Sequence, residues 1–244
     1  MLTLRNKKSK SGFQIKINDK FLEECESYKY LGVIIDKNLN WNSHIQHVCK
    51  KITKTCSYLS KLRHCVNIDT LISVYYALIH SYIRYGIIAW GTATESALQP
   101  LISIVNRAVR IMTFAPFGNI DVDSIYKYLD IPKIHDTIMI ETGKFIFKRE
   151  NGLLPNSDIA NHFRLRNGNV SHGYYLRNRG LNTPIIDYSS SFGEKSIQFR
   201  GAKVWNALPT DLCKTESLDF SRKNLKSHIF EDSSEEDDDI YFYY

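Results

Sequence analysis

Carboxylate side chains are the residues of this chain best suited to metal-dependent chemistry, and their densest group lies at the C-terminal end. Seven acids and no base lie between Glu231 and Tyr244, including the adjacent Asp237, Asp238 and Asp239. Nucleotidyl transfer by the two-metal route needs carboxylates that converge on two divalent ions a few ångströms apart. A segment of this composition is expected to be disordered, and a disordered segment does not hold metal ligands in a fixed geometry. We therefore predict no catalytic residue, no cofactor-binding residue and no metal ligand.

Cationic side chains recur at helical spacing in the first third of the chain. His47, Lys50, Lys54 and Lys61 follow one another at steps of three, four and seven residues, which places them on one side of a helix. Cations in such a row can follow a phosphate backbone. The alternative is an ordinary solvated face. We take these four as candidate nucleic-acid-binding residues.

Cysteines and histidines do not form a metal-binding pattern. The five cysteines are irregularly spaced and lack a Cys-x-x-Cys pair, as expected for reduced thiols in an intracellular protein, nuclear or cytoplasmic. His44, His47, Cys49 and His64 are close in sequence but fall on different helical faces, so a shared metal is not expected. We find no signal peptide and no apolar run of membrane-spanning length, and predict no membrane partner.

The net charge of +6 conceals an uneven distribution along the chain. Of the 26 acidic residues, seven lie in 231–244, which leaves 19 acids against all 32 bases in residues 1–230. A body with a net charge of about +13 suits a polyanion such as nucleic acid. A basic surface without any partner has the same composition, so charge alone does not decide between the two.

The elements that must position the basic row begin with short strands. Residues 13–17 alternate apolar and polar side chains, and Asn18-Asp19 marks a hairpin turn with a return strand from Phe21. The apolar run from Tyr28 to Ile35 predicts one strand covered on both faces. The chain is then expected to turn at residues 36–38.

Helical periodicity takes over after that turn, with Asn40 as the expected N-cap. The first helix has a predicted apolar stripe of Trp41, Ile45, Val48, Ile52, Cys56, Leu59 and Leu62. A second helix at about 70–85 has the stripe Leu71, Tyr75, Leu78 and Tyr82, and a third has Leu98, Leu101, Val105, Ala108 and Met112, with Pro100 in its first turn. Further helices are expected at 124–129, from Pro132 to about 150, at 197–208 and from Ser217, with an extended segment at 156–192.

These elements predict a mainly α fold with a small N-terminal antiparallel β element. A helical bundle is followed by a mixed, mostly helical C-terminal region. The expected segments are 1–36, 37–115, 116–230 and the acidic tail 231–244.

Short motifs occur in a fixed order along most of the chain. They are Tyr30-Leu31-Gly32-Val33, Asn40-Trp41-x-x-His44-Ile45, Tyr85-Gly86-x-x-x-Trp90-Gly91, Asn106-Arg107-Ala108-Val109-Arg110-Ile111, Leu153-Leu154-Pro155 and Arg200-Gly201-x-x-x-Trp205-Asn206-x-Leu208-Pro209. From about residue 13 to 230, their order and spacing resemble the end of the polymerase in jockey-like non-LTR (LINE-type) retrotransposons.

The resemblance implies a role for the first two predicted segments. Residues 1–36 would close the palm, with Tyr30, Leu31 and Gly32 in a primer-grip-like position, and residues 37–115 would form a thumb-like unit that holds the template–primer duplex. The complete enzymes are RNA-directed DNA polymerases that use Mg²⁺, and their catalytic aspartates lie upstream of the segment matched here. The chain is therefore expected to be inactive alone, to bind nucleic acid weakly, and to need the missing fingers and palm as partner.

Two further interpretations stay open at this point. In one, the chain is a domesticated, non-enzymatic module that binds a protein or an RNA. In the other, it is a fragment of a longer reading frame. An aromatic-x-Asp-Asp motif in frame upstream would favour the fragment.

Overall fold

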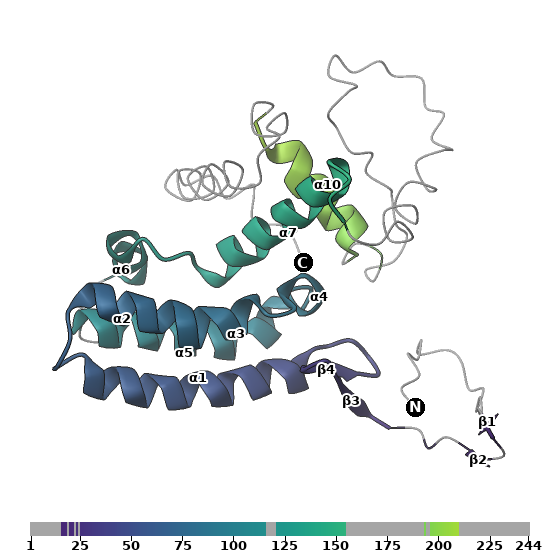
Figure 1. The fold of residues 1–244 in the computed structure, drawn as a ribbon, viewed down its shortest axis with the longest axis horizontal. Coiled ribbons are helices and arrows are strands. Elements are labelled where there is room, and N and C mark those ends of the chain that lie inside the picture. Colours follow the sequence, from purple (N-terminus) through teal and green to yellow (C-terminus); the bar gives the residue numbers. More distant parts are fainter. Residues whose placement is uncertain are drawn as a thin grey trace. The chain divides into compact units, whose positions relative to one another are not determined.

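The computed structural model describes residues 16–18, 20, 21, 23, 25–115, 121–154, 193 and 196–209. The predictions for 156–192, for a helix from Ser217 and for the tail 231–244 lie outside these residues. The chain divides into two compact units (Figure 1). The first contains the chain up to Gly86 together with Ala93–Ile131, and the second contains Ile87–Thr92 and the chain from Pro132.

The predicted mainly helical fold with a small N-terminal antiparallel β element is confirmed. In the described residues the elements are β1 (Lys16–Ile17), β2 (Lys20–Phe21), β3 (Ser27–Tyr30), β4 (Val33–Asp36), α1 (Asn42–Leu62), α2 (Ile68–Tyr75), the π-helical turn η1 (Tyr76–His80), α3 (Ser81–Arg84), α4 (Ile87–Trp90), α5 (Glu95–Thr113), α6 (Val122–Leu129), α7 (Ile134–Glu150) and α10 (Ile197–Ala207). None of the described helices is both long enough and apolar enough to cross a bilayer.

Two antiparallel hairpins form the β element. β1 pairs with β2 in the predicted place, with Lys16 opposite Phe21 and Asn18 at a positive φ of 46°. The prediction of one covered strand over 28–35 is wrong, because β3 and β4 pair with each other across a two-residue turn. The side chains of β3 are exposed and those of β4 are half-buried.

The long helix α1 packs against α5 in the first unit and buries the predicted stripe. Its members from Trp41 to Leu59 are at most 6% exposed, whereas Leu62, at the end of the helix, is 36% exposed. The predicted cap is corrected. The N-cap residue is Trp41, which has a left-handed φ of 65° and whose side chain makes no capping hydrogen bond.

The second predicted helix is present but contains a π-helical turn. Asn67 caps α2 by accepting a hydrogen bond from the Thr70 amide at 3.0 Å. Because a π turn closes i→i+5 hydrogen bonds, the buried stripe advances to Ile79 and Ile83. Leu78, predicted inside, is 42% exposed.

The third helix, α5, buries all five residues of its predicted stripe. Pro100 lies in the second turn rather than in the first as predicted. The missing proline N–H leaves the carbonyl of Ser96 without its helical donor, and Ser96 is exposed to water near the helix start. α6 follows, capped by Asp121, and the Tyr126 hydroxyl donates to Asn106 Oδ1 on α5 at 2.8 Å.

The second unit is built from α4, α7 and α10. Trp90 and Trp205 are 0% and 4% exposed, as expected for core residues, and Trp205 packs on Phe147 with ring centroids 6.5 Å apart. Gly201 allows α10 to approach α7 closely, because a Cβ there would lie 2.5 Å from Ile146 Cδ1. Arg200 Nη1 donates to the Gly91 carbonyl at 2.9 Å.

Candidate nucleic-acid interface

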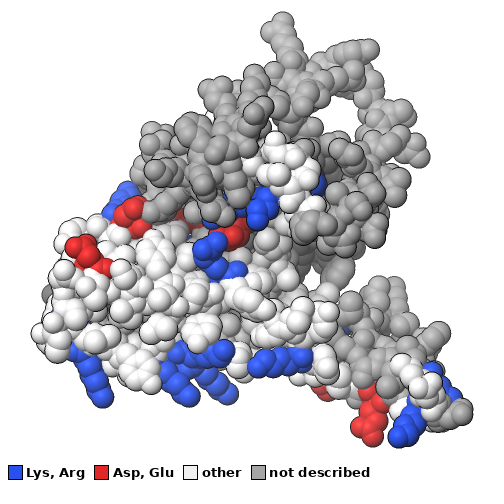
Figure 2. Space-filling view, viewed as in Figure 1, with Lys and Arg blue, Asp and Glu red and all other residues white. Residues whose placement is uncertain are grey.

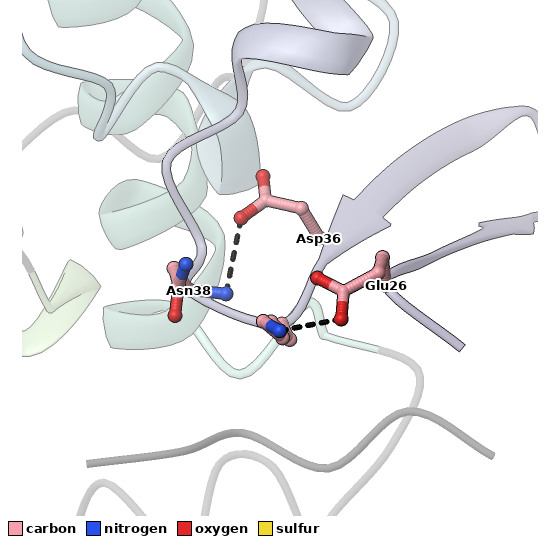
Figure 3. Close-up of polar contacts among 4 residues, drawn as sticks. Glu26, Asp36 and Asn38 are labelled. Atoms are coloured by element: carbon pink, nitrogen blue, oxygen red, sulfur yellow. Dashed lines mark hydrogen bonds and ion pairs between the residues drawn. The ribbon is translucent and has the colours of Figure 1, made fainter. Parts of the chain in front are cut away.

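The carboxylate of Asp36 fixes the connection between the β3–β4 hairpin and α1. Asp36 Oδ1 accepts from the amide of Asn38 at 3.0 Å (Figure 3). Oδ1 also accepts from the Asn40 amide at 3.1 Å, and Oδ2 accepts from the Trp41 amide at 2.8 Å. Lys37 Nζ forms an ion pair with Glu26 at 2.5 Å across the base of the hairpin. Because its oxygens accept three backbone amides, Asp36 acts as a structural group that orients the start of α1.

The residues predicted to be in a primer-grip-like position, Tyr30, Leu31 and Gly32, lie at the tip of the β3–β4 hairpin. Leu31 and Gly32 form its two-residue turn with φ values of 45° and 85°, and both angles are positive as in a type I′ turn. Tyr30 and Leu31 are 59% and 73% exposed. The Tyr85 hydroxyl donates to the Leu31 carbonyl at 2.5 Å, and a Cβ on Gly32 would lie 3.2 Å from Tyr85 Cε1. The tip is therefore held by the end of α3.

His44 connects the hairpin to the first turn of α1. Its side chain is buried, and its Nδ1 accepts a hydrogen bond from the Ile34 amide at 3.3 Å. Burial, with smaller contributions from His47 and Lys51, lowers the pKa of His44 from 6.5 to about 4. The imidazole is therefore neutral at pH 7, which leaves Nδ1 able to accept the amide proton.

The predicted basic row lies on the solvent side of α1. Lys50, Lys54 and Lys61 are exposed, and His47 is half-buried. Figure 2 shows basic groups along the edge of the molecule formed by α1, with no acidic group over the helix in that view. The sequence accounts for this, since there is no Asp or Glu between Asp36 and Asp69. We call these four residues the α1 basic row.

The pKa of His47 is affected by burial and by the cations around this row. It is lowered from its ordinary value of 6.5, first by burial and then by the charges of Lys51, Lys29 and Lys50. Lys29 lies on β3, so both the hairpin and α1 contribute cations to the surroundings of His47. Repulsion among these groups would be relieved by an anion.

Two of these cations were not among the sequence-predicted residues. Lys51 is exposed, and its Nζ lies 4.6 Å from the ring centroid of Tyr82 on α3. Lys29 comes from a different element. Lys51 follows His47 by one helical turn, so helical spacing could have identified it, whereas only the folded hairpin places Lys29 there.

A metal site for polymerisation does not fit the described residues. No group of three or more His, Cys, Asp and Glu side chains there is arranged to hold an ion. Asp36, the acid at the end of β4, accepts hydrogen bonds from three backbone amides. Asp237, Asp238 and Asp239 lie outside the described range.

Comparison with known proteins finds relatives among mobile-element polymerases. The chain is 28% identical over 138 residues to "RNA-directed DNA polymerase from mobile element jockey" of Drosophila funebris. It is 24% identical over 135 residues to the protein of the same name from Drosophila melanogaster, and 25% identical over 138 residues to the "Probable RNA-directed DNA polymerase from transposon BS" of that species. The resemblance to jockey-like non-LTR polymerases is thus confirmed.

The matched region covers only part of this chain and a small part of each relative. Each of these alignments covers 54% of this chain, a narrower span than the expected 13–230, and only 14–15% of the relative's length. No protein-family model matches the chain, and no solved structure matches it.

Proposed function

We propose that this chain is a nucleic-acid-binding part of a jockey-type RNA-directed DNA polymerase and has no nucleotidyl-transfer activity of its own. In this proposal the α1 basic row, together with Lys29 and Lys51, contacts the phosphate backbone of a template–primer duplex. The observation that carries it is the cationic, acid-free surface of α1. The similarity to RNA-directed DNA polymerases supplies the class of nucleic acid.

The geometry supports backbone contact without base recognition. Lys50 and Lys54 are one helical turn apart and Lys61 lies two turns further, so the cations extend along the helix. Lysine is a flexible point charge that neutralises phosphates without reading sequence. We therefore expect binding that depends on salt and is indifferent to base sequence.

The test is a duplex-binding titration of the full chain at low salt. Lys50→Glu combined with Lys54→Glu should weaken binding of an RNA–DNA duplex by about tenfold or more, because two phosphate contacts become repulsive. The readout is the fluorescence anisotropy of a labelled duplex. Lys127→Glu with Lys148→Glu makes the same change in net charge outside α1 and should leave the affinity within about twofold. Equal losses in both double variants would refute the assignment to α1.

A primer-extension assay tests the second half of the proposal. The purified full chain, supplied with Mg²⁺ or Mn²⁺, primer–template and dNTPs, should not extend the primer while it still shifts the duplex. Extension that persists through purification to homogeneity would show that the chain is an enzyme by itself.

The exposed apolar side chains of the hairpins favour protein interaction as a second candidate function. Five of them are more than half exposed: Ile17, Phe21, Tyr28, Tyr30 and Leu31. Exposed apolar clusters of this kind commonly mark protein contacts. The partner that the similarity suggests is the remainder of a jockey-type polymerase. Tyr28→Ser with Tyr30→Ser should abolish capture of that remainder in a pull-down and spare duplex affinity, whereas capture unaffected by both changes would argue against this role.

A further inference from the structure

A pocket lies beyond the C-terminal end of α1 in the first unit. It has a volume of about 380 Å³ and lies among the ends of α1, α2, α5 and α6. Its apolar floor includes Leu71 and Met112, each 2% exposed. Its rim includes Arg63, Phe114 and Tyr128. The pocket therefore combines two buried apolar side chains with a cation and two aromatic rings.

The rim is arranged as a stacking surface. Phe114 follows the last turn of α5 with a left-handed φ of 57°, and its side chain is 53% exposed. Arg63 Cζ lies 4.3 Å from the centroid of the Phe114 ring, and Arg63 Nη1 donates to the Ile111 carbonyl at 3.3 Å. His64 meets the same ring edge-on at 5.3 Å. Phe114 is thus held in place from one side while half of its surface meets solvent.

Tyr128 presents a second, more open ring. It is 74% exposed on α6, although it lines a pocket whose floor is apolar. Rings held this far out of the core contribute little to folding through burial. Aromatic side chains beside a cation are the groups on which single-stranded nucleic acids stack their bases.

The charge of the approach to the pocket favours a nucleic acid over an apolar peptide. Lys61 lies in the last turn of α1, two residues before Arg63, and it is the last member of the α1 basic row. From residue 37 to residue 68 the chain has six Lys and Arg residues and no acid. A phosphate backbone that follows the row would arrive at the rim of the pocket at the end of the helix.

We propose that this pocket binds one unpaired nucleobase of a strand whose duplex part is held along α1. The base would stack between Phe114 and Tyr128 over the apolar floor, while Arg63 stays against the Phe114 ring and holds it in place. The inference rests on the proposed function for the location of the duplex, and it adds a distinct ligand. The ligand is the junction between a duplex and a single strand.

The test compares a blunt duplex with the same duplex carrying a short 5′ or 3′ overhang, using the full chain. We expect one overhang to raise the affinity by about tenfold, which is the scale of stacking one base on aromatic side chains. A 2-aminopurine placed as the first unpaired base should lose fluorescence on binding, because stacking quenches it.

Two side-chain changes isolate the pocket from the basic row. Phe114→Asn with Tyr128→Ser removes both rings, and Asn tolerates the left-handed backbone at position 114. The double variant should lose the gain from the overhang and the quenching, yet bind the blunt duplex as the parent does. Tyr28→Ser, which removes a tyrosine on β3 that is 59% exposed, is the matched control and should keep both. A urea denaturation curve confirms that each variant is folded.

The outcomes separate this inference from the proposed function. Blunt-duplex binding without a gain from either overhang, or with a gain that the double variant keeps, would overturn the base site and leave the proposed function intact. The chain could instead bind single strands through Phe114 and Tyr128 and bind no duplex. That result would support base binding in the pocket and refute the duplex proposal. Failure to bind either would overturn both. A synthetic peptide of residues 231–244 can be added as a competing ligand. If it binds in the pocket and an overhang has no effect on affinity, the pocket is a site for a protein ligand and the base assignment is refuted.

Discussion

Two side chains, Asp36 and His44, determine how α1 leaves the hairpin. Asp36 accepts three backbone amides in the turn, and His44 accepts the Ile34 amide from the first turn of the helix. Both are polar groups whose hydrogen bonds go to the main chain. Each of them would be a candidate for catalysis from residue type alone, but their contacts indicate that they hold α1 in place.

The pKa of His44 predicts a pH-dependent stability. The unfolded chain binds a proton at this side chain below about pH 6.5, whereas the folded chain resists protonation down to about pH 4. The unfolded state is therefore favoured as the pH falls through this window, and the contribution is fully present above it. We expect the free energy of unfolding to fall by about 2–3 kcal/mol from this group. Urea denaturation at a series of pH values measures it.

His44→Asn provides the control, because its amide oxygen can accept the Ile34 amide and does not titrate. The variant should show a smaller loss of stability than the parent between pH 6.5 and pH 4. Parallel curves for the two proteins would mean that His44 is not the responsible group.

Sequence reasoning identified part of the candidate site at this scale. Helical spacing was sufficient for Lys50, Lys54 and Lys61, which are exposed as expected. It could not identify the contact between Arg63 and Phe114, because residues 51 positions apart meet only when α1 and α5 pack. Lys29 was missed for the same reason.

At the scale of elements, apolar stripes predict the helices correctly. The predictions that fail, for Leu78 and for the strand over 28–35, lie at irregular turns. The stripe of α5 is buried throughout, because an uninterrupted α-helix keeps the period that the prediction assumes. The π turn η1 adds a residue to one turn, and this shifts Leu78 outward. No residue type in Tyr76–His80 announces such a turn.

The β3–β4 hairpin is predicted as a single strand because its turn is unusually apolar. Type I′ turns favour Asn-Gly, and here Leu31 takes the first position at a positive φ. In the sequence, Tyr30-Leu31-Gly32-Val33 continues an apolar run and is therefore indistinguishable from the middle of a strand.

The same turn yields a prediction for two opposite substitutions. Leu31→Asn should stabilise the protein by about 0.5 kcal/mol, because Asn tolerates a left-handed backbone and the exposed Leu31 loses no burial. Gly32→Ala should destabilise it by about 1 kcal/mol or more, since φ is 85° and the added Cβ would press on Tyr85. Thermal unfolding measures both changes. A stabilising Gly32→Ala would show that the turn has another conformation in solution.

At the scale of the whole molecule, the distribution of charge predicts a salt dependence. If Lys50 and Lys54 each neutralise a phosphate, Lys50→Gln with Lys54→Gln should reduce the slope of log affinity against log salt by about 2. Anisotropy titrations over a series of salt concentrations measure this slope. Lys127→Gln with Lys148→Gln should leave it unchanged, and an equal reduction there would point to a diffuse field of the whole chain in place of contacts by α1.

The path of the backbone between the two units has a consequence for any attempt to divide the protein. Ile87–Thr92 belongs to the second unit although the chain on either side of it belongs to the first. Its Trp90 is fully enclosed, and Gly91 is bonded to Arg200. Cleavage of the chain at any single peptide bond therefore cannot separate the two units intact. A fragment that ends at Ile131 would contain Trp90 without the rest of the second unit, so we expect Trp90 to be exposed in such a fragment.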